Sequence, residues 1–143
     1  MDTRGMLKVV ARANNLHLMG TGFLKAVGVK AALDAYNGIG PEFFPPALRD
    51  AITRTLGLFE PPAVIHDCRF ERSDGTRRSF DYANNEFYVN CHKCAKAAYP
   101  WWSWKRYRAY AVIDAMYEFV SGDGGWKAWQ EAYEKRRMKQ GAG

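Results

Sequence analysis

The clearest secondary-structure signals of the chain lie between Pro61 and Phe87, in PPAVIHDCRFERSDGTRRSFDYANNEF. Paired prolines open its first half, where they cost a helix little because the first N–H groups of any helix lack a helical partner. The turn sequence SDGT divides the stretch, and no further helix breaker follows until Pro100. The pattern therefore predicts two helices, one beginning at the prolines and one over about 77–98, folded back antiparallel across a short connection.

The rest of the chain also has a helical pattern. Apolar residues recur three and four positions apart, and two-residue alternation is nearly absent. The strongest helix is predicted over 103–120, ahead of the glycine-rich SGDGG, and other helices over about 22–36, 45–57 and 126–138. We expect the 103–120 helix to bury one face, made by Trp104, Tyr107, Ala111, Ala115 and Phe119.

Length and composition favour one domain. The 143 residues are 48% hydrophobic and 25% charged, which is typical of a globular chain. We expect a single all-α domain over 1–143 with about five helices, in which 1–20 is an irregular N-terminal segment and 139–143 a flexible tail. No apolar run is long enough to span a membrane, and the first residues lack the apolar centre of a signal peptide, so a cytoplasmic location is expected.

The net charge of +6 favours an acidic partner, either nucleic acid or anionic lipid, without deciding between them. The three cysteines, Cys68, Cys91 and Cys94, are an odd number, which fits a reducing compartment better than a disulfide framework. Cys91 and Cys94 have the spacing of half a zinc site, but no second half follows. Buried core thiols are therefore favoured over zinc or redox chemistry.

An adjacent histidine and aspartate lie near the start of the helix predicted to begin at Pro61 and Pro62. His66 and Asp67 point about 100° apart on a helix, so they face different neighbours. Asp81 is expected to meet His66 across the turn, where a carboxylate would fix the imidazole tautomer for a general base. Asp67 would then be free to bind a hard cation. The alternative is structural, with Asp67 compensating the helix dipole and Asp81 an ordinary first-turn acid.

The segments AVIHDCRF and SFDYANNEF resemble the catalytic helix pair of the phospholipase A2 superfamily, and are closer to its small bacterial and phage-associated members. His66, Asp67, Phe70 and Asp81 carry the resemblance. It implies that His66 activates a water for attack on an ester carbonyl, that Asp81 orients His66 and that Asp67 binds calcium. Two features depart from the family. The segment before the helix has only one glycine, Gly57, where a glycine-rich calcium loop is expected, and Phe70 stands where tyrosine is common.

Aromatic and basic residues are interspersed in YPWWSWKRYRAY, residues 99–110. This composition is typical of a membrane interface or of a platform for single-stranded nucleic acid. The interpretation that we favour places Trp104 and Tyr107 in the core instead. If the segment is a membrane interface, its residues are Trp101, Trp102, Lys105, Arg106 and Arg108. The final run EKRRMKQ is expected to be a solvated tail.

Three functions are consistent with these patterns. The first is calcium-assisted hydrolysis of a phospholipid ester at an anionic lipid surface, by a phage-derived protein. The second is a non-catalytic phage or prophage structural or interaction protein that keeps the helical scaffold and binds a protein partner or the phage particle. The third, and the least supported, is a nucleic-acid-binding helical module that uses Arg106, Arg108 and the basic tail.

Overall fold

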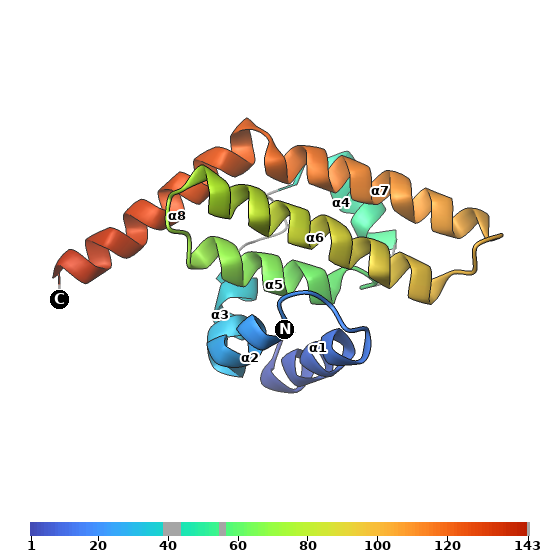
Figure 1. The fold of residues 1–143 in the computed structure, drawn as a ribbon, viewed down its shortest axis with the longest axis horizontal. Helices are drawn as coiled ribbons and strands as arrows, with labels where there is room; N and C mark the ends of the chain where they lie inside the picture. Colours follow the sequence, from blue (N-terminus) through green and yellow to red (C-terminus); the bar gives the residue numbers. More distant parts are fainter. Residues whose placement is uncertain (39–43, 55–56, 143) are drawn as a thin grey trace.

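In a computed structural model of the chain, the described residues are 1–38, 44–54 and 57–142, and they form helices without strands (Figure 1). This confirms the all-α class. The described helices are α1 (Thr3–Asn15), α2 (Thr21–Val27), α3 (Val29–Gly38), α4 (Pro46–Arg54), α5 (Glu60–Glu71), α6 (Arg77–Ala98), α7 (Trp104–Ser121) and α8 (Asp123–Ala142).

The expectation of about five helices is wrong, mainly at the two ends. Asp2 caps α1 by accepting a hydrogen bond from the Gly5 N–H, so the segment expected to be irregular is largely helical. The helix predicted over 22–36 is two helices, because Gly28 has a φ of 89° and separates α2 from α3. Helix α8 continues to Ala142, where a flexible tail was expected.

The antiparallel pair predicted from the Pro61–Phe87 stretch is present as α5 and α6 (Figure 1). Aromatic contacts give its register. The His66 ring lies 4.7 Å from the Phe87 ring, and one turn later on α5 the Phe70 ring lies 6.1 Å from that of Phe80, centroid to centroid. Thr76 caps α6 by accepting a hydrogen bond from the Ser79 N–H. The two helices place His66 and Asp67 in the middle of the fold.

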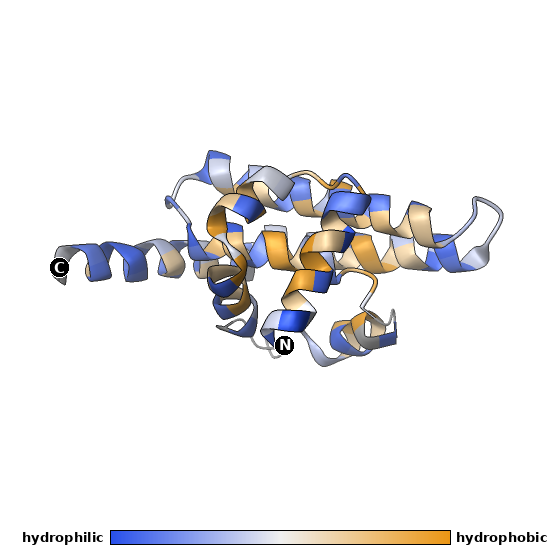
Figure 2. Cartoon of the chain, turned by 90° about the horizontal axis from the view of Figure 1, so that it is seen from below, coloured by the Kyte–Doolittle hydropathy of each residue, from blue (hydrophilic) through white to orange (hydrophobic). Residues whose placement is uncertain are grey.

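Two apolar clusters hold the helices together. The larger cluster contains buried residues of α1, α5, α6 and α7, among them Met6, Ile65 and Ile113. The smaller joins α5, α6 and α8 through Phe70, Phe80, Ala83 and Trp129. Burial of each large apolar side chain contributes about 1.5–3 kcal/mol. The smaller cluster fixes the first half of α8 against the α5–α6 pair, while the mostly hydrophilic C-terminal end of α8 extends beyond the body (Figure 2).

The prediction of which face of α7 is buried is wrong. Its buried residues are Ala109, Ile113, Met116 and Val120. Trp104 and Tyr107 are instead 65% and 57% exposed. Apolar residues recur at helical spacing on both faces of α7. The face that includes the small residue Ala109 allows closer packing on α6 than the face with the large aromatic side chains.

Cys68, Cys91 and Cys94 are free thiols in the larger cluster, as the core interpretation predicted. Burial raises the pKa of all three, to about 12 for Cys68 and about 11 for Cys94. The thiols are therefore protonated and unreactive at neutral pH. Of the helices described, none combines the length and the apolar character that crossing a membrane requires.

Candidate functional site

His66 is buried on α5, between the rings of Phe70 and Phe87. Its Nε2 lies 2.8 Å from Oδ1 of Asn84 on α6. Burial lowers the pKa of His66 to about 4, because desolvation disfavours the charged ring more than the Asn84 hydrogen bond favours it. The ring is therefore neutral at neutral pH.

Asn84 fixes which nitrogen of His66 carries the proton. Its Nδ2 donates to the Val120 carbonyl oxygen at 3.3 Å, so its Oδ1 faces the imidazole as an acceptor. Nε2 must then be the protonated nitrogen that donates. Nδ1 keeps its lone pair and makes no hydrogen bond with any residue in the described ranges. His66 is thus held as a neutral imidazole with one free acceptor nitrogen.

A glycine on α8 makes room for the carbonyl that orients Asn84. A Cβ built on Gly125 would overlap the Val120 carbonyl, whose carbon would be only 2.6 Å away. Any side chain at this position would force α7 and α8 apart, so the close approach requires glycine. The junction between α7 and α8 therefore belongs to the support of His66.

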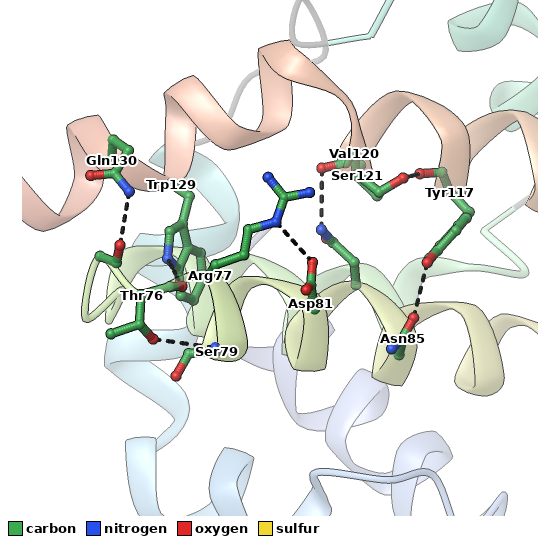
Figure 3. A network of polar contacts seen from close by, with 12 residues as sticks. Thr76, Arg77, Ser79, Asp81, Asn85, Tyr117, Val120, Ser121, Trp129 and Gln130 are labelled. Atoms are coloured by element: carbon green, nitrogen blue, oxygen red, sulfur yellow. Dashed lines mark hydrogen bonds and ion pairs between the residues drawn. The ribbon is translucent and has the colours of Figure 1, made fainter.

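Asp81 does not occupy the place expected for it. Its side chain is 54% exposed, and its Oδ1 lies 3.3 Å from Nε of Arg77, one turn earlier on α6 (Figure 3). The expected contact with His66 is replaced by that of Asn84, which lies three residues further along the same helix. A carboxylate at a helix start is stabilised well by solvent and a neighbouring arginine, whereas the buried position beside His66 holds a neutral amide.

Asp67 is partly buried and lies with His66 and Phe70 along a cleft of about 370 Å³. Burial raises its pKa well above the ordinary value. No ion pair or hydrogen bond of the Asp67 carboxylate occurs among the described residues. The cleft thus contains a general-base candidate and a carboxyl group that forms no ion pair with any described residue.

The residues around Asp67 do not form a shell for calcium. Calcium binds six to eight oxygens, and the described ranges contain no group of three or more His, Cys, Asp or Glu residues close enough to hold a metal ion. The segment before α5 that was considered as a calcium loop includes 55–56, which lie outside the described residues. The assignment of Asp67 to calcium stays a prediction.

One wall of the cleft comes from α8, which the sequence predicted to end as a solvated tail. Lys135, Arg136 and Lys139 line it. Arg136 also donates from Nη1 to the Ser73 carbonyl oxygen at 2.8 Å, which ties this part of α8 to the end of α5. These cations are about 70 residues from His66 in the chain, so no local spacing could have placed them there.

Asn84 was also missed, but a signal for it was present. It continues the apolar stripe of α6, four residues after Phe80 and three before Phe87. A polar residue on the buried stripe of a helix must have a hydrogen-bond partner. The same argument applies to Asn90, whose side-chain amide pairs with both the N–H and the carbonyl of Met19.

The residues predicted as a membrane interface lie at the connection from α6 to α7, at the end of the molecule opposite the C-terminus (Figure 1). Trp101 and Trp102 are 73% and 70% exposed, as expected for anchors. Lys105 and Arg108 are also exposed, while the Arg106 Nε donates to the Tyr110 hydroxyl. From Asn84 to this end of α6 is roughly 20 Å at 1.5 Å per residue. The exposed aromatic tip, Trp101 to Arg108, is therefore remote from the cleft.

Comparison of the chain with models of protein families, with curated proteins and with solved structures finds no match. The site must therefore be interpreted from its own geometry.

Proposed function

We propose that the protein hydrolyses an ester bond of a phospholipid, with His66 as the general base. The observation that carries the proposal is the hydrogen bond from His66 Nε2 to Asn84 Oδ1, beside a cleft of about 370 Å³. A buried, neutral imidazole with a fixed tautomer and a free Nδ1 is suited to accept a proton from water. The segments AVIHDCRF and SFDYANNEF resemble the phospholipase A2 superfamily in sequence, which implies the same reaction, with Asn84 rather than Asp81 beside His66.

In this mechanism Nδ1 of His66 removes a proton from a water molecule while the water oxygen attacks the ester carbonyl. The tetrahedral intermediate then expels the alcohol oxygen, which receives the proton from Nδ1, so that a fatty acid and a lysophospholipid are released. Asn84 keeps the ring in position throughout. As a neutral amide it stabilises the transient imidazolium less than a carboxylate would, and slow turnover is expected.

Calcium stays part of the proposal only through Asp67. A bound calcium ion would supply Lewis-acid polarisation of the ester carbonyl. Asp67 would be its protein carboxylate ligand, in competition with the proton that burial favours.

The second candidate is a non-catalytic interaction protein, of a phage particle or another assembly, and one observation favours it. Exposed aromatic patches of this kind mark binding surfaces, and the exposed aromatic tip lies roughly 20 Å along α6 from Asn84, at 1.5 Å per residue. Under this alternative, the tip binds a protein partner or an anionic lipid surface. Replacement of Trp101 and Trp102 by serine would abolish that binding without changing the cleft.

Hydrolysis is tested by incubating the purified protein with phospholipid in mixed micelles, with calcium and with a chelator, and measuring fatty acid and lysophospholipid by mass spectrometry. The proposal expects product from the wild type and none from His66→Gln, a variant whose fold is checked by circular dichroism. Absence of product from the folded wild type in both conditions would leave the interaction protein as the better account.

A further inference from the structure

The cleft beside His66 has a cationic wall. Lys135 and Lys139 lie four residues apart, which places them on the same face of α8, and Arg136 lies between them. The wall is held in place by the Arg136 bond to the Ser73 carbonyl and by Gln130, whose Nε2 donates to the Gly75 carbonyl oxygen at 2.8 Å. Lys135 and Arg136 therefore lie on an anchored part of α8, and the exposed Lys139 lies one turn beyond Lys135.

The other side of the cleft is acidic. Asp34 comes from α3, and Asp67 and Glu71, four residues apart on one face of α5, complete it. Helix α5 packs against both α3 and α8, so the cleft lies where the three helices meet. Carboxyl groups and cations thus line the same space from different helices.

These opposite charges do not neutralise one another. Among the described residues, no ion pair joins Asp34 or Glu71 to Lys135 or Lys139. An open cleft between separated positive and negative groups is complementary to a ligand that carries both charges. A purely anionic ligand would meet the carboxylates, and a purely cationic ligand would meet the lysines.

Resting on the proposed function, the geometry points to a phosphoethanolamine headgroup as the part of the substrate that this cleft binds, with its phosphate on Lys135 and Lys139 and its ammonium on Asp34 and Glu71. Lysine is a common phosphate ligand, acting as a point charge. The headgroup would lie beside Asp67, one residue from His66, where the ester of the same lipid must reach Nδ1.

The aromatic content of the cleft selects a primary ammonium over a quaternary one. Quaternary ammonium groups such as choline are bound by cages of several aromatic faces. Here the aromatic rings are His66 and Phe70, which pack against each other with centroids 4.4 Å apart. Carboxylates are instead suited to the three N–H donors of a primary ammonium.

The test uses ligands without an acyl ester, so that binding is measured apart from hydrolysis. Glycerophosphoethanolamine, glycerophosphocholine and glycerol 3-phosphate are titrated into the wild-type protein, followed by isothermal calorimetry and by amide chemical shifts. We expect glycerophosphoethanolamine to bind at least about tenfold more tightly than either of the others.

Two sets of variants separate the two charges. Lys135→Gln with Lys139→Gln is expected to weaken binding of glycerophosphoethanolamine and glycerol 3-phosphate alike. Asp34→Asn with Glu71→Gln is expected to weaken glycerophosphoethanolamine alone. Lys127→Gln is the matched control, because Lys127 is on the same helix, 79% exposed, and pairs with Glu131 outside the cleft.

The inference is overturned if glycerophosphoethanolamine shows no saturable binding, if glycerol 3-phosphate binds as tightly, or if the lysine pair can be removed without loss. These outcomes differ from failure of the proposed function. Hydrolysis of phosphatidylethanolamine and phosphatidylcholine at equal rates without headgroup binding would leave the hydrolase and remove this inference. Selective headgroup binding without hydrolysis would do the reverse.

Discussion

His66 on α5 and Asn84 on α6 are joined by a buried hydrogen bond of 2.8 Å, and Asn84 is itself held by the Val120 carbonyl on α7. Three helices therefore cooperate to orient one imidazole. Since Asn84 is fully buried, the chain Val120–Asn84–His66 contributes to stability as well as to the site.

Asn84→Ala is expected to destabilise the fold by about 1–3 kcal/mol, because it leaves the His66 Nε2–H and the Val120 carbonyl without partners in a buried place. Urea unfolding measures this. The matched control is Asn85→Ala, which removes an exposed hydrogen bond to the Tyr117 hydroxyl and should cost less than about 1 kcal/mol. Equal losses in the two variants would argue against a buried role for Asn84.

Asp81→Asn tests whether Asp81 supports His66, as expected from the sequence, or is a surface residue, as in the structure. Among the described residues Asp81 pairs with Arg77 alone, at the surface, and such pairs contribute about 0–1 kcal/mol, so stability and lipid hydrolysis should both be unchanged. Stability is followed by thermal unfolding and hydrolysis by release of lysophospholipid. Loss of hydrolysis in a folded Asp81→Asn protein would show that Asp81, rather than Asn84, supports His66.

Acid should destabilise the protein through His66. Its pKa falls from 6.5 to about 4 on folding, so the unfolded chain binds a proton first as the pH decreases. The stability present above pH 6.5 is therefore lost as the pH falls toward 4, by about 3 kcal/mol in total. Denaturant unfolding between these pH values checks it, preferably in the Asp67→Asn background, where the neighbouring carboxyl group does not titrate.

The matched control for this pH dependence is His17→Asn, which removes an exposed histidine with a φ of 53° that asparagine tolerates. Its unfolding profile should follow that of its parent, whereas His66→Gln should flatten the profile. A profile unchanged by His66→Gln would mean that His66 is already charged, or equally solvated, in the folded protein.

Asp67 has the opposite pH dependence. Burial raises the pKa of Asp67 in the folded protein above its ordinary value of 3.8. The buried carboxyl group therefore does not reduce the stability of the protein below pH 3.8, and it reduces the stability increasingly as the pH rises toward the folded pKa. Asp67→Asn should therefore raise the melting temperature, and more so at pH 8 than at pH 4. Glu71→Gln, at an exposed position one turn away, is the control and should show no such trend.

The same Asp67 variant tests calcium. A ligand that binds only the folded protein raises its stability, so calcium bound through Asp67 would increase the melting temperature of the wild type and not that of Asp67→Asn. A chelator should reverse the increase. No shift in the wild type at millimolar calcium would remove calcium from the account and leave the general base unaffected.

Local patterns were enough to predict part of this fold. The paired prolines, the SDGT turn and the uninterrupted run after it predict α5 and α6 because each signal acts within a few residues. The partner of His66 could not be predicted in this way. Asp81 and Asn84 are less than one helical turn apart, and only the packing register of α5 on α6 decides between them.

The cationic wall was beyond local patterns for another reason. Lys135 and Lys139 look like a solvated tail in the sequence, and they reach the cleft because Trp129 packs α8 onto Phe70 and Phe80. The buried face of α7 was predicted wrongly for a similar reason. Two helical faces carry apolar residues at the right spacing, and contact with α6 selects the one with Ala109 and Ile113.

The protonation of the His66 ring can be measured from long-range proton–nitrogen NMR correlations across a pH titration. We expect a neutral ring with its proton on Nε2 at pH 7, which titrates only near pH 4, and loss of this pattern in Asn84→Ala. A proton on Nδ1, or a ring that charges near its ordinary pKa of 6.5, would contradict it.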